Sequence, residues 1–169
     1  MKDNIILIGM MGSGKTTVAR ELAANLKSFK LVDIDEEIEK STGKKISEIF
    51  LKFGEKHFRL LEEDKIRQVC EKYSQIIALG GGAFETPDNR NLLLNSGKVI
   101  YLKASAREIF ERIKLETHRP LLKKNFSIER INSLIEAREI NYKKAHIQID
   151  TNGKTPYNIV EEILGVLNG

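Results

Sequence analysis

The sequence predicts a three-layer αβα domain with a five-stranded, mainly parallel central sheet. Two patterns lead to this prediction: short, buried-type aliphatic runs, and amphipathic helical patterns that fill most of the gaps between them. The 169 residues contain no internal repeats and no low-complexity linkers. A chain of this length can bury a substantial core, so we expect residues 1–169 to form a single domain.

Five short apolar segments are the predicted strands. The first, residues 4–9 (NIILIG), is an almost continuous aliphatic run, which is typical of a strand buried on both faces of a parallel sheet. The other four are residues 30–33, 75–79, 98–102 and 146–149. The pattern does not give the order of the strands. Ligands bind outside the carboxyl ends of the strands in such sheets, so functional residues are expected just after each strand.

Composition favours an ordinary globular protein of the cytoplasm. Hydrophobic residues make up 41% and charged residues 31% of the chain, and no apolar run is long enough to span a membrane. The first apolar stretch is too short for a secretory signal. The formal charge of +4 is spread along the chain, so it fits a solvated surface or small anionic ligands better than a nucleic acid. No long apolar stripe calls for a partner, so we expect a monomer.

A phosphate-binding loop follows the first predicted strand. Residues 9–16 read GMMGSGKT and match G-x-x-x-x-G-K-[ST] between a strand and a helical pattern, the context that this motif requires. The glycines let backbone N–H groups surround a phosphate at the start of the helix. Lys15 would then reach the β- and γ-phosphates, and the Thr16 hydroxyl would bind Mg²⁺. A chance glycine turn is disfavoured because motif, strand and helix coincide.

Two acidic residues, Asp33 and Asp35, come directly after the second predicted strand. In an extended segment they would project to the same side, so one could hold a Mg²⁺-bound water while the other accepts the proton of an attacking hydroxyl. The alternative is that Asp35 caps a helix whose first turn contains Glu36 and Glu37. A guanine-reading N-K-x-D segment does not occur, so a GTPase switch is disfavoured.

Two arginines are candidates for binding an anionic substrate. Arg138 continues the apolar stripe of a helix that is predicted to begin near Ser127, so it would point inward and need an anion, either a substrate carboxylate or an internal one. Arg59 lies on a helix after Gly54, where position alone favours a surface arginine that pairs with Glu62 or Glu63.

A polar, basic segment at about 114–125 is predicted to be a short lid. Its Arg119 precedes a proline, which favours an extended conformation, and could neutralise charge on the transferring phosphoryl group. Three histidines, His57, His118 and His146, have no obvious partner and are expected to face solvent.

Together these segments resemble the shikimate kinase family. The matching segments, in the order and spacing of that family, are GMMGSGKTT, DIDEEIE, ISEIF, GEKHFRLLE, LGGGA and HRPLL. The resemblance covers nearly the whole chain, and the combination is more specific than the phosphate loop by itself. It implies a P-loop kinase fold, with a substrate-binding helical region at about 35–62, that transfers phosphate from ATP to the 3-hydroxyl of shikimate.

The resemblance also implies a role for each matched position. Asp35 would be the base and contact the acceptor hydroxyl, Arg59 and Arg138 would hold the shikimate carboxylate, and Gly81 would offer a backbone N–H. Asp33 would bind the water shell of the Mg²⁺ that Thr16 ligates, and Lys15 and Arg119 would act directly in the transfer. The residues implied to bind ATP are Gly12, Ser13, Gly14, Lys15, Thr16, Thr17, Arg112, Arg119 and Pro156, with Arg112 and Pro156 on either side of adenine.

Two positions depart from the family pattern. Residues 138–142 read REINY where RxPLY is frequent, and Ala19 replaces a frequent glycine. Two rival functions stay open at this point: another small-molecule kinase, acting on gluconate or a nucleoside monophosphate, and a nucleotide-dependent binding or switch module.

Overall fold

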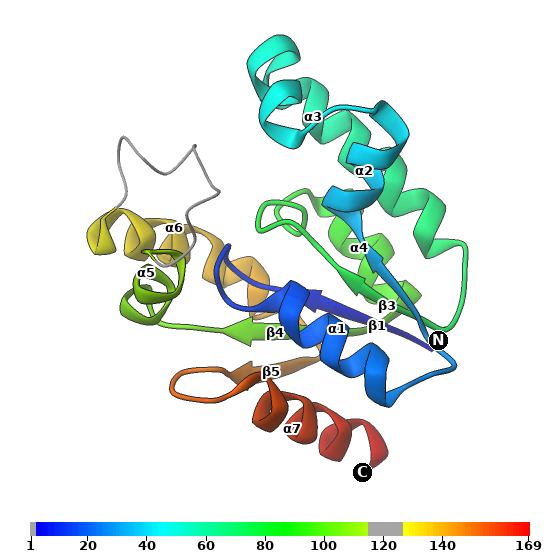
Figure 1. The fold of residues 1–169 in the computed structure, drawn as a ribbon, viewed down its shortest axis with the longest axis vertical. Coiled ribbons are helices and arrows are strands. Elements are labelled where there is room, and N and C mark those ends of the chain that lie inside the picture. Colours follow the sequence, from blue (N-terminus) through cyan, green and yellow to red (C-terminus); the bar gives the residue numbers. More distant parts are fainter. Residues whose placement is uncertain (1–2, 115–126) are drawn as a thin grey trace.

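The computed structural model describes residues 3–114 and 127–169. One sheet of five parallel strands lies between two layers of helices (Figure 1). The strand order is β2-β3-β1-β4-β5, and all four neighbouring pairs are parallel. The strands are β1 (Asn4–Ile8), β2 (Lys30–Asp33), β3 (Gln75–Ala78), β4 (Gly97–Lys103) and β5 (Ile147–Asp150). The predicted fold class is confirmed, with strand ends shifted by one residue at several places.

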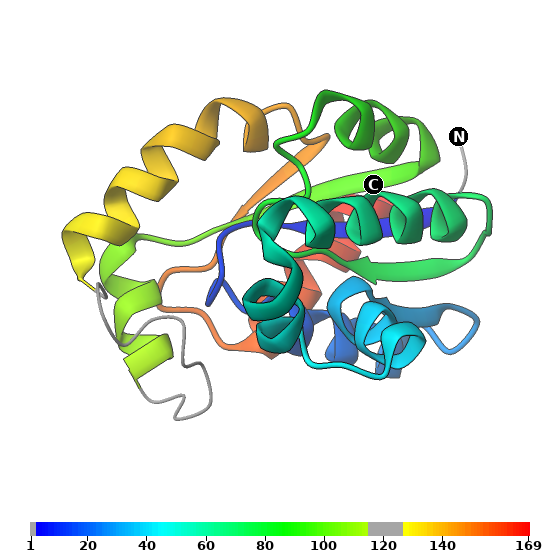
Figure 2. The same cartoon turned by 90° about the horizontal axis from the view of Figure 1, so that it is seen from above.

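The helices occupy the segments between the strands. They are α1 (Lys15–Asn25), α2 (Ile34–Thr42), α3 (Ile46–Cys70), α4 (Pro87–Ser96), α5 (Ala106–Lys114), α6 (Ile128–Tyr142) and α7 (Pro156–Asn168). Helix α3 changes direction at Gly54, whose φ of 79° and ψ of 171° are not helical (Figure 2). Glycine tolerates this backbone conformation, so the bend needs no strained side chain.

The core has two parts because successive side chains of each strand point to opposite faces of the sheet. Ile5 and Leu7 of β1 pack with α1 and α7, whereas Ile6 and Ile8 pack with the helices of the other face, which include α3, α4 and α6. All four of these isoleucine and leucine side chains are almost fully buried. Burial on both faces explains why apolar and polar residues do not alternate along β1. The same packing holds the phosphate loop in place at the end of this central strand.

No helix within the described ranges is long and apolar enough to cross a membrane. Cys70 is buried at the end of α3, where it packs in the core as a small apolar side chain. The predicted lid lies outside the described residues except for Lys114, and Arg119 and His118 lie there as well.

His146 is exposed, as expected, but it has a hydrogen-bond partner, which was not expected. Its Nδ1 accepts a hydrogen bond from the backbone N–H of Val99 at 3.0 Å, next to the start of β5. This side-chain contact precedes the ladder between β4 and β5, whose register begins at Ile100 and Ile147. The strand was predicted to begin at His146 because a sequence pattern does not reveal such a contact.

The hydrogen bond to His146 predicts a pH dependence of stability. Partial burial, and to a lesser extent Lys98, lower the pKa of His146 from its ordinary value of 6.5. The unfolded chain therefore binds more protons than the folded one near that pH, and the unfolding free energy should fall as the pH drops through about 6.5. Urea titrations at several pH values check this. His146→Asn keeps an acceptor but cannot titrate, so a fall of equal size in both proteins would contradict the assignment.

Candidate active site

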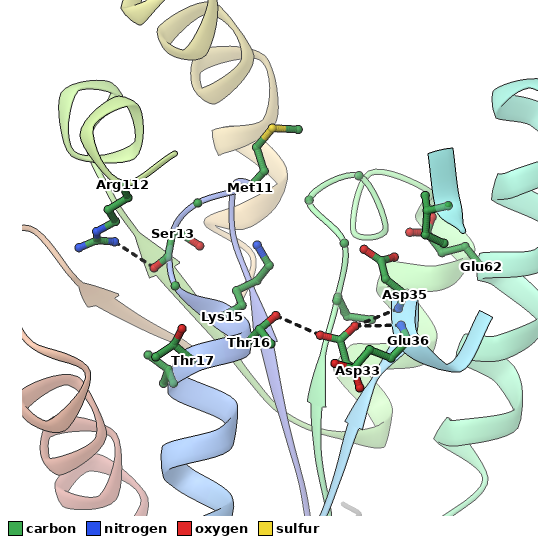
Figure 3. Close-up of a pocket in the computed structure, with 18 of the residues that line it drawn as sticks. Met11, Ser13, Lys15, Thr16, Thr17, Asp33, Asp35, Glu36, Glu62 and Arg112 are labelled. Atoms are coloured by element: carbon green, nitrogen blue, oxygen red, sulfur yellow. Dashed lines mark hydrogen bonds between the residues drawn. The ribbon is translucent and has the colours of Figure 1, made fainter. Parts of the chain in front are cut away.

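A cleft of about 1030 Å³ lies at the carboxyl ends of the strands. Because the strands are parallel, the segments that follow all of them meet at this edge of the sheet. The cleft contains every predicted site residue within the described ranges: Gly12, Ser13, Gly14, Lys15, Thr16, Thr17, Asp33, Asp35, Arg59, Gly81, Arg112, Arg138 and Pro156. Figure 3 shows the part of the cleft around the phosphate loop.

The loop between β1 and α1 has the conformation that a phosphate-binding loop needs. Gly12 and Gly14 have φ values of 76° and 94°, in the left-handed region that favours glycine. Helix α1 begins at Lys15, and no side chain caps it, so the N–H groups of its first turn remain available to an anion. The buried Lys15 ammonium lies 2.8 Å from the carbonyl oxygens of both Gly9 and Met10, which holds it against the loop.

Thr16 and Asp33 are hydrogen-bonded to each other. The Thr16 hydroxyl donates to Asp33 Oδ2 at 3.0 Å (Figure 3). The other oxygen, Oδ1, accepts from the backbone N–H groups of Asp35 at 3.0 Å and Glu36 at 3.3 Å. Asp33 therefore links the first turns of α1 and α2. Hydroxyl and carboxylate oxygens are the ligands that Mg²⁺ prefers, so these two side chains fit a magnesium site.

The helix cap is Asp33, so the alternative that gave this role to Asp35 is wrong. The prediction that Asp33 and Asp35 lie on one extended segment is also wrong, because β2 ends at Asp33 and Asp35 lies in the first turn of α2. Helix α2 begins at Ile34, two residues earlier than a cap at Asp35 would place it. The reason is that the Asp33 carboxylate accepts hydrogen bonds from the N–H groups of the first turn of α2. Both carboxylates nevertheless line the same cleft.

Arg59 and Glu62 form a partly buried ion pair on α3. Arg59 Nη1 donates to Glu62 Oε2 at 2.7 Å, and Nη2 contacts Glu55 at 3.2 Å. The Glu62 side chain is only 1% exposed, whereas that of Arg59 is 32% exposed and lines the cleft. Glu62 and Glu63 were the two expected partners of Arg59. Arg59 pairs with Glu62, whereas Glu63 pairs with Arg67.

The electrostatics around Glu62 connect it to the proposed base. Burial raises the pKa of the Glu62 carboxyl, the Arg59 guanidinium opposes that shift, and Asp35 adds to it. Sequence reasoning did not include Glu62 in the site. The signal was present, because Phe58, Glu62 and Ile66 are spaced four residues apart on the apolar face of α3, and all three are buried. The position of Glu62 on an apolar helical stripe is of the same kind as that of Arg138 on α6.

The three glycines after β3 each face a different charged side chain. A Cβ atom on Gly80 would lie 3.1 Å from Glu62 Oε1 and 3.5 Å from Asp35 Oδ1. On Gly81 it would lie 3.2 Å from Arg138 Nη1 and 3.3 Å from the backbone nitrogen of Met11. On Gly82 it would lie 2.5 Å from Arg59 Nη2. The glycines thus allow one carboxylate pair and two guanidinium groups to pack against the backbone beside the phosphate loop.

Comparison with known proteins identifies the family. Residues 11–168 match the family model described as shikimate kinase. A shikimate kinase from Thermodesulfovibrio yellowstonii is 47% identical over 161 residues, which cover 95% of this chain and 92% of that protein. One from Geobacter metallireducens is 43% identical over 166 residues, covering 98% and 92%. This chain belongs to the shikimate kinase family.

Solved structures of shikimate kinases have the same fold. The enzyme from Acinetobacter baumannii, in complex with shikimate, superposes with a TM-score of 0.92 at 34% identity, covering 99% of this chain and 94% of that one. The enzyme from Aquifex aeolicus gives a TM-score of 0.85 at 36% identity, with coverage of 98% and 96%. The predicted family resemblance is confirmed, and ATP is the co-substrate of shikimate kinases.

Arg112 joins three segments at the phosphate-loop end of the cleft. Its guanidinium donates to the carbonyl oxygens of Ser13 at 3.1 Å and Thr151 at 2.9 Å, and Nε donates to Glu108 at 3.1 Å (Figure 3 shows the Ser13 bond). It therefore fastens α5 to the phosphate loop and to the end of β5. Pro156, at the start of α7, lines the same cleft.

The departure from the family pattern at residues 138–142 has a structural reason. The two residues that are kept, Arg138 and Tyr142, are one helical turn apart and point toward the glycine loop. Ile140 between them is 71% exposed, whereas Asn141, the other changed position, is partly buried and bonds to Glu85. The changes therefore keep the inward positions of Arg138 and Tyr142. Ala19 is fully buried in α1, where its methyl group packs in the core on the α7 side of the sheet.

Proposed function

We propose that this protein transfers the γ-phosphate of ATP to the 3-hydroxyl of shikimate, a step in the pathway to chorismate and the aromatic amino acids. The observation that carries the proposal is the convergence of Asp35, Arg59 and Arg138 on three consecutive glycines beside the phosphate loop. Two guanidinium groups and one carboxylate suit an acceptor that has a carboxylate and a hydroxyl. The Acinetobacter baumannii structure, which contains shikimate, supports this choice.

The phosphate loop would hold the nucleotide. The N–H groups at the start of α1 and the residues from Gly12 to Thr17 would surround the phosphates, with the Lys15 ammonium beside the β- and γ-oxygens. Adenine would lie between Arg112 and Pro156, as the family resemblance implies. The contact of Arg112 with Ser13 would then make the adenine pocket and the phosphate loop a single rigid unit.

Thr16 and Asp33 would hold Mg²⁺, Thr16 directly and Asp33 through a bound water. When bound, the ion would neutralise charge on the β- and γ-phosphates. Their hydrogen bond of 3.0 Å brings two oxygen ligands together. The described part of the chain contains no group of three or more His, Cys, Asp or Glu side chains that could hold a metal ion. Such a site suits Mg²⁺, which keeps several waters and uses few protein ligands.

On the acceptor side, Asp35 would act as the base. Its carboxylate would accept the proton of the acceptor hydroxyl as oxygen attacks the γ-phosphorus and the bond to the β-phosphate oxygen breaks. Arg59 and Arg138 would bind the acceptor carboxylate, and the Gly81 N–H would contact the acceptor directly. Fixing the acceptor at both ends places its hydroxyl in line with the phosphate, which supplies much of the rate enhancement of such reactions.

Further expectations belong to the proposal. The lid at about 114–125 would supply Arg119 to the transferring phosphate, and both rest on the family resemblance because they lie outside the described residues. The chain would act as one domain, with residues 35–62 binding the acceptor. We also propose that it is a cytoplasmic monomer that binds no nucleic acid.

An ADP-release assay with several acceptors tests the proposed reaction. Purified protein with ATP and Mg²⁺ should release ADP when shikimate is added, and much less with gluconate or AMP. Turnover with gluconate or AMP but not with shikimate would show another small-molecule kinase. ATP binding without turnover on any acceptor would favour a binding or switch module.

The close approach of Gly82 to Arg59 gives a specific prediction. In Gly82→Ala, the new methyl group would overlap the guanidinium, with distances of 2.5 Å to Nη2 and 2.8 Å to Cζ. Because the arginine end is flexible, it should move and leave the backbone in place. We expect the KM for shikimate to rise about 10- to 100-fold, while the KM for ATP stays within about twofold.

Gly165→Ala is the matched control for this substitution. Gly165 lies on α7, and a Cβ atom there has no neighbour within 4 Å. This variant should keep both KM values. An unchanged KM for shikimate in Gly82→Ala would show that Arg59 does not bind the acceptor in the position described here.

A further inference from the structure

The last residue of α6, Tyr142, is a buried phenol that contacts the glycine loop. Its side chain is fully buried, and its ring lies 4.9 Å from the ring of Tyr101, centroid to centroid. Its hydroxyl donates a hydrogen bond to the carbonyl oxygen of Gly81. This hydroxyl is a buried polar group, and the Gly81 carbonyl, with the Met10 sulfur 3.9 Å away, satisfies it.

A second side chain of α6 holds the other end of the same loop. Asn141 Nδ2 donates to Glu85 Oε2 at 3.0 Å. Arg138, one turn earlier, lies 3.6 Å from the sulfur of Met10 through Nη1 and faces Gly81. The end of α6 therefore bonds to the loop at two points four residues apart in sequence, while the same helix presents an arginine to the acceptor side of the cleft.

The bond to the Gly81 carbonyl determines where the next N–H points. The peptide unit between Gly81 and Gly82 is planar, so fixing its C=O toward α6 directs its N–H to the opposite side. No described residue accepts a hydrogen bond from the N–H groups of Gly81 or Gly82, and both glycines line the cleft. These glycines have no side chain to hold the loop in place, so it depends on contacts made by other elements.

We propose that Tyr142 is a positioning residue for the acceptor: its hydroxyl, with Asn141 as a second tie, holds the glycine loop so that its N–H groups and Arg138 face the bound carboxylic acid together. The inference rests on the proposed function of this cleft. Burial raises the pKa of the Tyr142 hydroxyl well above its ordinary value, so the group stays protonated and remains a donor to the carbonyl.

Tyr142→Phe tests the proposal, with Tyr101→Phe as its matched control. Each removes one buried hydroxyl from the same pair of rings, but Tyr101 lies on β4 and has no hydrogen bond to the glycine loop. Removing the tie should raise the KM for shikimate about three- to tenfold, the worth of one hydrogen bond. The KM for ATP and kcat should stay within about twofold. Tyr101→Phe should leave all three constants unchanged.

Calorimetric titration with shikimate in the absence of ATP gives a second, direct readout of acceptor binding. Asn141→Ala, which cuts the tie to Glu85 together with an exposed contact to Lys144, covers the case in which Tyr142→Phe does not fold, and should raise the KM for shikimate about two- to fivefold.

A Tyr142→Phe enzyme with an unchanged KM and Kd for shikimate would overturn the proposal. So would equal losses in the constants for ATP and shikimate together with a lowered urea midpoint, because these indicate a purely structural role. A wild-type enzyme that does not phosphorylate shikimate would instead show that the proposed function fails.

Discussion

Asp35→Asn is expected to lower kcat with shikimate by about 10²- to 10⁴-fold, the usual contribution of a positioned general base. The amide is almost the same size as the carboxylate but cannot accept the proton of the attacking hydroxyl. The fold of this region should survive, because the contact that caps α2 uses the backbone N–H of Asp35 rather than its side chain. ATP affinity should remain within about twofold, since Thr16 is hydrogen-bonded to Asp33.

The measurement is steady-state kinetics combined with a direct titration of ATP. Glu37→Gln is the matched control, because Glu37 lies on the same first turn of α2 but pairs with Lys40 rather than lining the cleft. Near-normal turnover in Asp35→Asn would refute the base. A parallel loss of ATP affinity would show that Asp35 belongs to the nucleotide site instead.

Arg59→Met should have two separable effects. The first is a rise of about 10- to 100-fold in the KM for shikimate, because a charged hydrogen-bond partner of the acceptor carboxylate is lost. The second is a loss of stability of about 2–4 kcal/mol, less than the full cost of breaking a buried pair because Arg59 is itself one-third exposed. This loss arises because Glu62 stays buried without its guanidinium partner.

The pH dependence of this loss follows from the sign of the Glu62 shift. The pKa of Glu62 is already raised by burial, and losing Arg59 raises it further, so the folded variant binds more protons than the unfolded chain. The unfolding free energy of Arg59→Met should therefore decrease as the pH rises above the ordinary value of 4.5, and the deficit should be smallest in acid.

A double variant separates the two roles of Arg59. Adding Glu62→Gln removes the buried charge, so Arg59→Met/Glu62→Gln should regain much of the lost stability while the KM for shikimate stays high. Urea unfolding and steady-state kinetics on the single and double variants measure both quantities. If stability and KM recover together, Arg59 supports the fold and does not bind the acceptor.

The glycine-rich motif fixes much of the fold in advance, because it requires a strand before it and a helix after it. The buried character of β1, which is flanked by strands on both sides, follows from its aliphatic run in the same way. The order of the strands does not follow, because the local pattern of a strand is the same wherever it lies in a parallel sheet. The end of β2 at Asp33 was predicted, but the helix that begins directly after it was not, because a carboxylate can follow a strand or cap a helix and only its hydrogen bonds distinguish the two.

The site was predictable where a motif or a helical stripe contained the residue. Arg138 could be placed from its spacing on α6, whereas Arg59 needed the family resemblance because its helix position favoured a surface pair. Tyr142 was missed because it acts through the Gly81 carbonyl, and a contact between residues far apart in the chain leaves no local pattern. Glu62 is different, because it lies three residues from Arg59 on a buried stripe of α3 that could have revealed it.

Because β1 lies at the centre of the strand order, the two flanks of the sheet carry different parts of the proposed site. On the proposed assignment, the groups that would bind the nucleotide, such as Arg112 and Pro156, follow β4 and β5 on one flank, and those that would bind the acceptor, such as Asp35, follow β2 and β3 on the other. Substitutions on one flank should not change the contacts of the other. The exception is α6, which follows β4 but contacts the glycine loop after β3. Such an arrangement lets descendants of one ancestor acquire new substrates while drawing on the same phosphate source.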